Sequence, residues 1–242
     1  MGIPQIINKN NLLTALLLFI FLPVNYQLFW KTPAIGNLAA LIVIAGCFVF
    51  FHQKIDFIRF FAGLIFGSLG EISAVSFGVW YYALPDFFGI PIWLGLYWGV
   101  GILLSGVLAD SLGMKNSKTV NPWKEFIVFS GVYSAILAVL YFFPKDNLII
   151  LALFSVLFLI VFRIKNKEHL FFALFLAPAG TILEIYFTFQ NVWGYTNPCF
   201  FKITYWLPLL YALFSVTLLR LISGIHFFIQ NPKTAKIKSL DK

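Results

Sequence analysis

Two carboxyl groups of this sequence lie deep inside apolar segments, where they could hold a polar group of a ligand or exchange a proton with it. Glu71 and Glu184 are the only two of the nine acidic residues that stand well inside an apolar run. Each is about 15 residues into its run, or about 22 Å along a helix that rises about 1.5 Å per residue. An ionised carboxylate at that depth in a bilayer is costly, so both side chains must face a partner, water or the inside of a helix bundle.

The segment around each glutamate occurs twice. When the sequence is shifted by 113 positions, Gly67–Leu104 aligns with Gly180–Thr217 without a gap, and 13 of the 38 pairs are identical. The identities follow the pattern E-x8-W-x-Y-x2-P-x7-W-L, which begins at Glu71 and again at Glu184. Apolar helices can agree through composition alone. A shared Glu, two Trp, a Tyr and a Pro at fixed offsets indicate an internal duplication instead.

The spacing of small residues predicts how the two glutamates are oriented. Gly63, Gly67 and Glu71 follow one another at steps of four, so they share one helix face that is suited to close packing. The second copy carries a similar but more polar face, formed by Gly180, Glu184, Thr188 and Asn191. We expect both faces to point toward a twofold axis between the copies, with the two carboxyl groups at similar depth.

Paired carboxyl groups in such a place suit acid–base chemistry on an apolar substrate. Burial and the neighbouring carboxylate would keep a proton on one of them, and that proton could be given to the substrate. We expect the outer mouth of the cavity to be lined by Trp80, Tyr82, Trp93, Trp193, Tyr195, Trp206 and Asn191. An aromatic cavity with one proton donor suits an isoprenoid or another lipid. A structural alternative stays open, since a buried Glu can hydrogen-bond a neighbouring helix and Trp and Tyr gather at membrane interfaces.

The composition is that of a membrane protein. The chain is 61% hydrophobic and 11% charged, whereas a soluble domain is about one-quarter charged. The net charge of +8 does not indicate nucleic-acid binding, because the basic residues gather in the loops of one side. Two cysteines and three scattered histidines give neither a disulfide framework nor a His-rich metal site. A phosphate-binding G-x4-G-K-S/T motif is absent, and we predict no metal and no cofactor.

The expected fold is all-α, a polytopic membrane protein with eight transmembrane helices. The apolar runs cover residues 11–29, 36–52, 56–79, 91–109, 124–143, 147–163, 168–190 and 204–223. Their lengths suit membrane spans, and helices satisfy their own backbone hydrogen bonds in lipid. The shift of 113 positions maps the first four runs onto the last four, which predicts four-helix repeats at 1–113 and 114–226 and a basic tail at 227–242. An even number of helices per repeat makes the repeats parallel, related by an axis along the membrane normal.

The distribution of basic residues predicts the orientation. With eight spans, 14 of the 17 Lys and Arg residues fall on the side of the two termini, and Lys31, Lys145 and Lys202 fall on the other. The positive-inside rule therefore places both termini in the cytoplasm, in a membrane of the bacterial inner-membrane type. The basic tail would then lie near anionic lipid at the cytoplasmic face. The sequence leaves the oligomeric state open.

Glu71, Trp80, Tyr82 and Pro91 resemble the membrane-embedded lycopene cyclase domain of carotenoid synthesis. That family has an acidic residue, then W-x-Y/F at this spacing, then a Pro followed by paired Glu. The resemblance implies acid chemistry on an isoprenoid, although the positions of the paired Glu are Trp93 and Leu94 in this sequence. The segment Pro91-x-Trp93-Leu94-x3-Trp98 also resembles a helix of an uncharacterised family of small bacterial inner-membrane proteins.

These observations lead to three functional hypotheses. The first is a membrane protein that acts on or binds a lipid or isoprenoid in an aromatic pocket of the outer leaflet, with Glu71 and Glu184 as acid, base or polar anchor. The second is a small secondary carrier, in which the two glutamates bind a proton or another cation. The third is a structural or assembly subunit, in which the small-residue faces serve packing alone. The sequence does not decide whether the protein is an enzyme.

Overall fold

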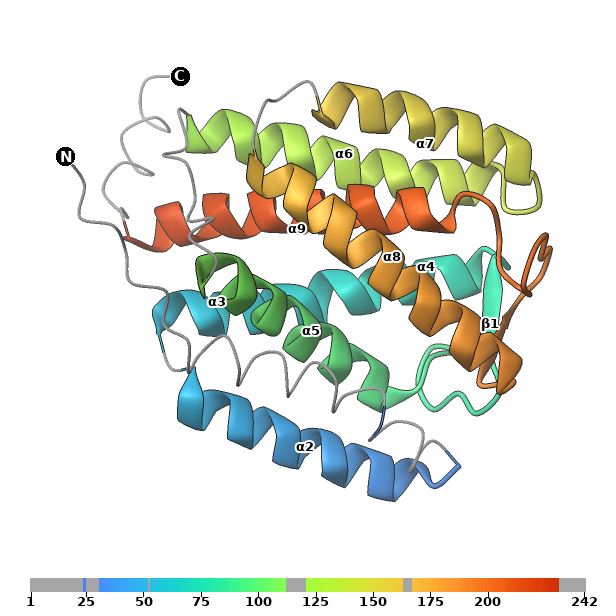
Figure 1. Cartoon of the computed structure of the whole chain (residues 1–242), viewed down its shortest axis with the longest axis horizontal. Helices are drawn as coiled ribbons and strands as arrows, with labels where there is room; N and C mark the ends of the chain where they lie inside the picture. The colour runs from blue at the N-terminus through green and yellow to red at the C-terminus, as the bar shows by residue number, and fades with distance from the viewer. Residues whose placement is uncertain (1–23, 25–30, 52, 112–120, 163–166, 231–242) are drawn as a thin grey trace.

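The computed structural model describes residues 24, 31–51, 53–111, 121–162 and 167–230. The first half of the chain forms α2 (Pro33–Phe50), a continuous helical rod and α5 (Ile92–Ser111). The rod consists of α3 (Lys54–Ala62), a π-helical turn η1 (Gly63–Gly67) and α4 (Ser68–Ser76). The second half forms α6 (Pro122–Phe142), α7 (Asn147–Phe162), α8 (Lys167–Phe189) and α9 (Leu207–Gln230). Short strands β1 (Trp80–Tyr82) and β2 (Trp193–Tyr195) follow α4 and α8 (Figure 1).

Local sequence signals fix several helix ends. Gln53 and Asp56 form a reciprocal capping box at the start of α3. Asn121 caps α6 by accepting a hydrogen bond from the Lys124 backbone N–H at 3.1 Å, and Pro122 at the first helical position suits a helix start. Between such ends the sequence is an almost unbroken run of apolar residues, which become helical in lipid because a helix pairs its own backbone groups.

Four of the described helical stretches are long and apolar enough to cross a membrane: Lys54–Ser76, Ile92–Ser111, Pro122–Phe142 and Leu207–Gln230. Three shorter apolar stretches cover Ala34–Phe50, Asn147–Val161 and Ala173–Phe189. Seven of the eight apolar runs predicted from the sequence thus coincide with described helices. The first, 11–29, lies outside the described residues except for position 24. The chain is therefore a helical membrane protein with four candidate spans in the part that the structure describes.

The inner helices of the bundle are α5 and α9. Helix α5 packs against α2, α3 and η1, while α9 packs against α6, α7 and α8. Most residues of α5 and half of the residues of α9 are buried. The peripheral helices α2 and α7 instead expose large apolar side chains, such as Ile42 at 66% and Leu148 at 70% exposure. An apolar outer surface of this kind is expected where lipid, rather than water, surrounds the bundle.

The two strands pair antiparallel and connect the two halves of the chain. Trp80 lies opposite Tyr195, Tyr81 opposite Gly194, and Tyr82 opposite Trp193. A Cβ at Gly194 would come within 2.6 Å of the Tyr81 hydroxyl oxygen, so a larger residue there would require the exposed Tyr81 side chain to move. Each strand stands 113 positions from its partner, so equivalent segments of the duplicated pattern pair with each other.

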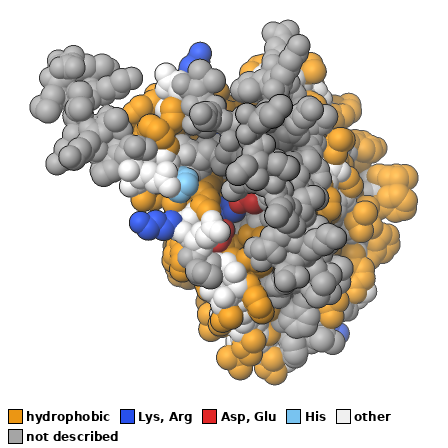
Figure 2. All heavy atoms as spheres, turned by 60° about the vertical axis from the view of Figure 1, so that its left-hand side comes forward, with side chains coloured by type: hydrophobic (Ala, Val, Ile, Leu, Met, Phe, Trp, Pro, Cys, Tyr) orange, Lys and Arg blue, Asp and Glu red, His pale blue; other side chains and the backbone are white. Residues whose placement is uncertain are grey.

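Buried ion pairs lie toward the end of the molecule opposite the strands. Arg59 contacts Asp56 at 3.3 Å and Asp110 at 2.9 Å, and Arg220 contacts Glu125 at 3.2 Å. Figure 2 shows acidic and basic side chains side by side at the end of the molecule away from the strands. Arg59 and Arg220, two of the cations that the sequence analysis counted on the side of the termini, are thus buried near the ends of spans. The membrane orientation predicted from the loops remains a prediction.

Candidate ligand-binding site

The Glu71 carboxylate accepts three hydrogen bonds from aromatic side chains. The Trp80 indole Nε1–H donates to Oε2 at 2.9 Å, and the Tyr82 hydroxyl donates to the same oxygen at 2.7 Å. The Trp98 Nε1–H donates to Oε1 at 3.0 Å. Glu71 is 8% exposed. Through these hydrogen bonds, the Glu71 carboxylate on α4 connects this helix to β1 and α5.

Glu184 repeats this arrangement in the second half of the chain. Trp193 Nε1–H donates to its Oε2 at 2.6 Å, and the Tyr195 hydroxyl donates to the same oxygen at 2.9 Å. The donor to Oε1 is now the Tyr211 hydroxyl, at 2.8 Å. Tyr211 stands 113 positions after Trp98. The two sets of donors are therefore equivalent position by position and differ in one residue type.

The strand pair brings the two sets of donors together. The Trp80 and Tyr195 rings lie 5.7 Å apart, and so do the Tyr82 and Trp193 rings. The third donors also meet, because the Trp98 and Tyr211 rings stack at 6.5 Å with 22° between their planes. Aromatic pairs at these separations are attractive, and they hold the two halves together around the glutamates.

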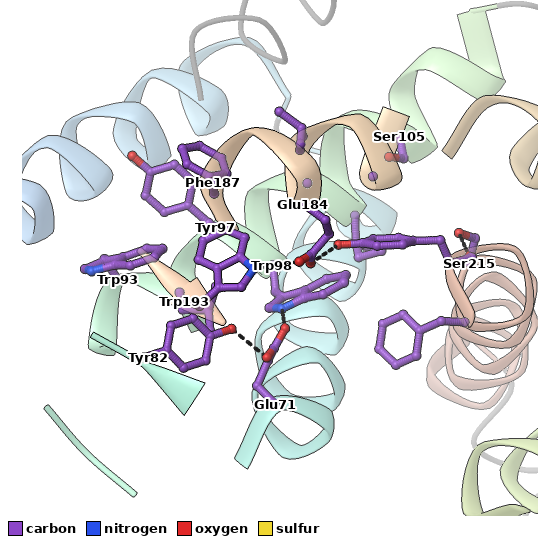
Figure 3. A pocket seen from close by; sticks show the side chains of 17 residues that line it. Glu71, Tyr82, Trp93, Tyr97, Trp98, Ser105, Glu184, Phe187, Trp193 and Ser215 are labelled. Atoms are coloured by element: carbon purple, nitrogen blue, oxygen red, sulfur yellow. Dashed lines mark hydrogen bonds between the residues drawn. The ribbon is translucent and has the colours of Figure 1, made fainter. Parts of the chain in front are cut away.

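Both glutamates line one cavity of about 190 Å³. Eight of its 17 lining residues are aromatic, and Figure 3 shows these rings surrounding the Glu71 and Glu184 carboxyl groups. A second, smaller cavity of about 50 Å³ also includes both glutamates and lies beside Trp80 and Tyr195. The larger space exceeds what a single water molecule needs. Its apolar lining with two convergent acids is the usual composition of a site for a small ligand.

The small residues before each glutamate make room for the third donor. A Cβ on Gly67 would overlap the Trp98 side chain, and a Cβ on Gly180 would come within 2.5 Å of the Tyr211 ring. Gly63 is as restricted, since its Cβ would stand 2.6 Å from the Trp98 carbonyl oxygen. The predicted small-residue faces therefore contact α5 and α9.

A helix-perturbing feature precedes each glutamate. The π-helical turn Gly63–Gly67 ends four residues before Glu71, and Pro178 lies inside α8 six residues before Glu184. The Tyr133 hydroxyl donates to the Phe66 carbonyl oxygen at 2.8 Å, so it satisfies one acceptor within the π turn. π turns within α-helices are frequent at functional sites. A π turn in the first copy and a proline inside the helix in the second thus stand one to two turns before the carboxyl group.

The aromatic residues predicted to line the site do not all line the same cavity. Tyr82, Trp93 and Trp193 line the larger cavity, and Trp80 and Tyr195 line the smaller one. Trp206 lies outside the described lining of both: it is 1% exposed and donates to the Asn147 Oδ1 atom at 2.8 Å. The structure places Trp206 in the core, where the Asn147 side chain pairs its N–H group, and a ligand contact of Trp206 stays a prediction.

Asn191 is not brought to either cavity. It is exposed and its backbone φ is 57°, a left-handed conformation that Asn adopts more readily than most residues. Its Oδ1 atom accepts a hydrogen bond from the Lys202 Nζ atom at 3.4 Å. The structure thus places Asn191 in the turn between α8 and β2, and its predicted ligand contact stays a prediction.

The sequence did not point to Trp98 and Tyr211 as partners of the glutamates. Both lie 27 residues after their glutamate, and both carry an aromatic N–H or O–H donor. Because they differ in type, an alignment of identical residues passes over them. A comparison of donor chemistry at the shifted positions would have found them.

In the part of the chain that the structure describes, the larger cavity is lined by acidic but not by basic side chains. Its described lining includes two Glu and no Lys, Arg or His. Within the described part of the chain, no group of three or more His, Cys, Asp or Glu side chains could hold a metal ion. Among the described residues, hydrogen-bond donors, and not cationic side chains, therefore stabilise the two carboxyl groups.

No protein-family model and no curated protein matches this chain. Two solved structures resemble it, both of MvINS, a mycobacterial Insig homolog from Mycobacterium vanbaalenii. The match to MvINS has a TM-score of 0.56 and covers 71% of this chain and 94% of MvINS. The match to a cross-linked MvINS trimer, made with a cysteine variant, has a TM-score of 0.55 and covers 71% and 93%. Sequence identity is 16% in both.

At this level of identity the likeness shows the fold alone. The chain has the fold of a bacterial Insig homolog, and its apolar helices make it an integral membrane protein. The resemblance to the lycopene cyclase domain is not shown by these comparisons. It rests on the Glu71, Trp80, Tyr82 and Pro91 motif alone.

Proposed function

We propose that this protein binds a lipid or isoprenoid in the cavity between its two halves. This proposal rests on one observation: Glu71 and Glu184 come from segments 113 positions apart and line the same aromatic, apolar cavity. The walls suit a hydrocarbon chain or ring, and the carboxyl groups suit a single polar group of the ligand. In this proposal Tyr82, Trp93 and Trp193 contact the apolar body, and Trp80 and Tyr195 hold the glutamates in place.

The same proposal includes the topology predicted from the sequence. Eight helices form two parallel repeats at 1–113 and 114–226, with both termini and the 227–242 tail at the cytoplasmic face of a bacterial inner membrane. Support comes from element order: α2, the rod, β1 and α5 in the first half correspond to α7, α8, β2 and α9 in the second. Helix α8 begins and ends 113 positions after Lys54–Ser76, as the repeat requires.

Lipid that co-purifies with the protein tests the binding function. Wild type and the Glu71→Gln/Glu184→Gln double variant would be purified in mild detergent and compared by mass spectrometry, with bulk membrane lipid as reference. The proposal predicts one species enriched over bulk in wild type and lost in the double variant. Lipid profiles equal to bulk in wild type would contradict it.

A structural role for the glutamates is the second candidate, and one observation favours it. All three donors to Glu71 come from its own half of the chain, and so do all three donors to Glu184. Each carboxylate could thus fasten a strand and two helices without any ligand. In that case either Glu→Gln substitution would lower the melting temperature of the protein and leave the co-purifying lipid unchanged in well-folded samples.

A further inference from the structure

The smaller cavity beside the glutamates is built from the same positions as the larger one. Under the shift of 113 positions, 11 of its 14 described lining residues are equivalents of residues that line the larger cavity. Leu207 and Tyr195, for example, take the places of Leu94 and Tyr82. The remaining three come from α6: Ile136, Leu137 and Leu140. One pair of glutamates thus has equivalent surroundings on two sides, the larger cavity along α5 and α8 and the smaller along α9 and α4.

The residues that line both cavities form the wall between them. They are Glu71, Trp98, Glu184, Tyr211 and Phe214. Because both carboxyl groups line both cavities, a polar group of a ligand could reach them from either side. The acids therefore do not select a side for the apolar body of the ligand. That selection must come from side chains that differ between equivalent positions.

Gly101 and Phe214 are equivalent positions with opposite effects on the space beside them. A Cβ on Gly101 would meet no atom within 4 Å, so α5 leaves this part of the larger cavity open. On α9 the equivalent residue is Phe214, whose ring is 9% exposed. The side chain itself thus takes up space on the α9 side that glycine leaves free on the α5 side.

The Phe214 ring reaches from α9 to α4. A Cβ at Gly70 on α4 would lie 3.7 Å from the Phe214 Cε2 atom. The ring also packs against Trp98 and Tyr133, with centroids 5.1 and 6.1 Å apart. Gly70 leaves room for this ring, whereas its equivalent Leu183 is one of the residues that line the larger cavity. An aromatic ring therefore fills the apolar space beside the carboxyl groups on the α4–α9 side.

The volumes of the two cavities agree with this difference. The larger measures about 190 Å³ and the smaller about 50 Å³. An engineered apolar cavity of about 150 Å³ in a protein core binds benzene. The larger cavity therefore has room for a ring or for part of a chain, and the smaller, which α6 also encloses, has room for neither.

We infer that Phe214 is a specificity-determining residue: its ring stands in the place of the ligand on the α4–α9 side and confines the ligand to the α5–α8 side. The smaller cavity is then a second, closed copy of the binding site, and each chain binds one ligand in one orientation. This inference rests on the proposed function, because it says on which side of the glutamates the lipid or isoprenoid of that proposal lies.

Photolabelling with a decanol that carries a diazirine in its chain tests the inference. The full chain in phosphatidylcholine nanodiscs would be labelled with and without excess decanol, and the labelled residues would be mapped by peptide mass spectrometry. Label that excess decanol suppresses is saturable. In wild type, saturable label should be at least about tenfold stronger at the α5 and α8 residues of the larger cavity than at the α4 and α6 residues of the smaller. This comparison needs no variant.

Substitutions at the two equivalent positions should redirect the label. Phe214→Ala should raise saturable label on α4 and α6 about tenfold, because removal of a large buried ring leaves a space that a small apolar ligand can fill. The exchange Gly101→Phe/Phe214→Gly should move the label from α5 and α8 to α4 and α6. Phe154→Ala is the control: it removes a ring that is 0% exposed on α7 and lines neither cavity in the described part of the chain.

The outcomes separate the inference from the proposed function. If wild type carries equal saturable label on both sides, the inference is overturned and the proposed function stands. The same holds if Phe214→Ala, folded by its melting curve, gains no label on α4 and α6, or if Phe154→Ala gains as much. If wild type carries no saturable label, the proposed function fails and the inference fails with it. Should Phe214→Ala not fold, the comparison of the two sides in wild type still decides.

Discussion

Trp98 and Tyr211 donate to the Oε1 atoms of two different glutamates, and their rings stack on each other at 6.5 Å. Each residue thus belongs to the hydrogen-bonding group of its own half and to the contact between the halves. The pair also marks the one difference in donor type between the two halves. A substitution at either position should therefore alter the surroundings of both glutamates.

Removing these donors separately is the first prediction. Tyr211→Phe keeps the ring and removes the hydroxyl, so Glu184 loses one hydrogen bond at a cost of about 1–2 kcal/mol in unfolding free energy. Trp98→Phe also removes part of the stacked ring, and we expect a loss of about 3 kcal/mol. Thermal unfolding in detergent measures both. A stability of Tyr211→Phe above that of wild type would contradict the hydrogen-bonding role of the hydroxyl.

The tight approach of α5 to the rod gives a second prediction. Gly67→Ala places a methyl group on the Trp98 side chain, and we expect a loss of about 1–3 kcal/mol from overpacking. Gly180→Ala should behave alike against Tyr211. Gly131→Ala serves as control, because its Cβ meets open space, and it should be neutral or slightly stabilising. Equal melting temperatures for Gly67→Ala and Gly131→Ala would show that the close contact is not maintained.

The buried ion pairs give a third prediction. Arg59 is 5% exposed and bonds to Asp56 and Asp110. Arg59→Met would leave the Asp56 carboxylate buried without a cation, which costs about 3–5 kcal/mol. Lys54→Met, at an exposed position at the start of the same helix, should change stability by less than about 0.5 kcal/mol. Similar melting curves for the two variants would contradict the buried network.

Membrane orientation gives a fourth prediction. A reporter fused after Pro85 should be reached from outside the membrane, and one fused after Lys118 only from the cytoplasm. Selective labelling in intact cells distinguishes the two positions. The opposite labelling pattern would reverse the predicted orientation and place the strand pair at the cytoplasmic face.

The glutamate sites show how far the sequence alone could lead. Trp80 and Tyr82 stand nine and eleven residues after Glu71, within the repeated pattern, and in the structure both donate hydrogen bonds to its carboxylate. These partners could be anticipated because short spacing keeps a helix end and the following strand together. Trp98 is 27 residues away and its equivalent is a different residue, so only the packing of α5 against the rod reveals it.

Long-range contacts are also hidden from the sequence. It places Arg59 and Arg220 near the ends of apolar runs on the side of the termini, and the structure adds that acids on other helices pair with both buried guanidinium groups. Trp206 was expected at the cavity because its repeat partner Trp93 lies there. In the second half, Asn147 lies near Trp206 and accepts its N–H group. Position within a repeat therefore predicts the backbone better than it predicts the partners of a side chain.

The most direct test of the central claim is native mass spectrometry of the protein released from mild detergent or nanodiscs. Gly101 lines the cavity and a Cβ there meets no atom within 4 Å, so Gly101→Leu would fill the space. Gly131 is equally open but lies exposed on α6, so Gly131→Leu is the control. Wild type and Gly131→Leu should carry a bound species of defined mass, and Gly101→Leu should lack it while remaining folded. Loss of the adduct only in Gly101→Leu would support a ligand in the cavity that Glu71 and Glu184 line. The same adduct on all three proteins, or none on wild type, would contradict the account.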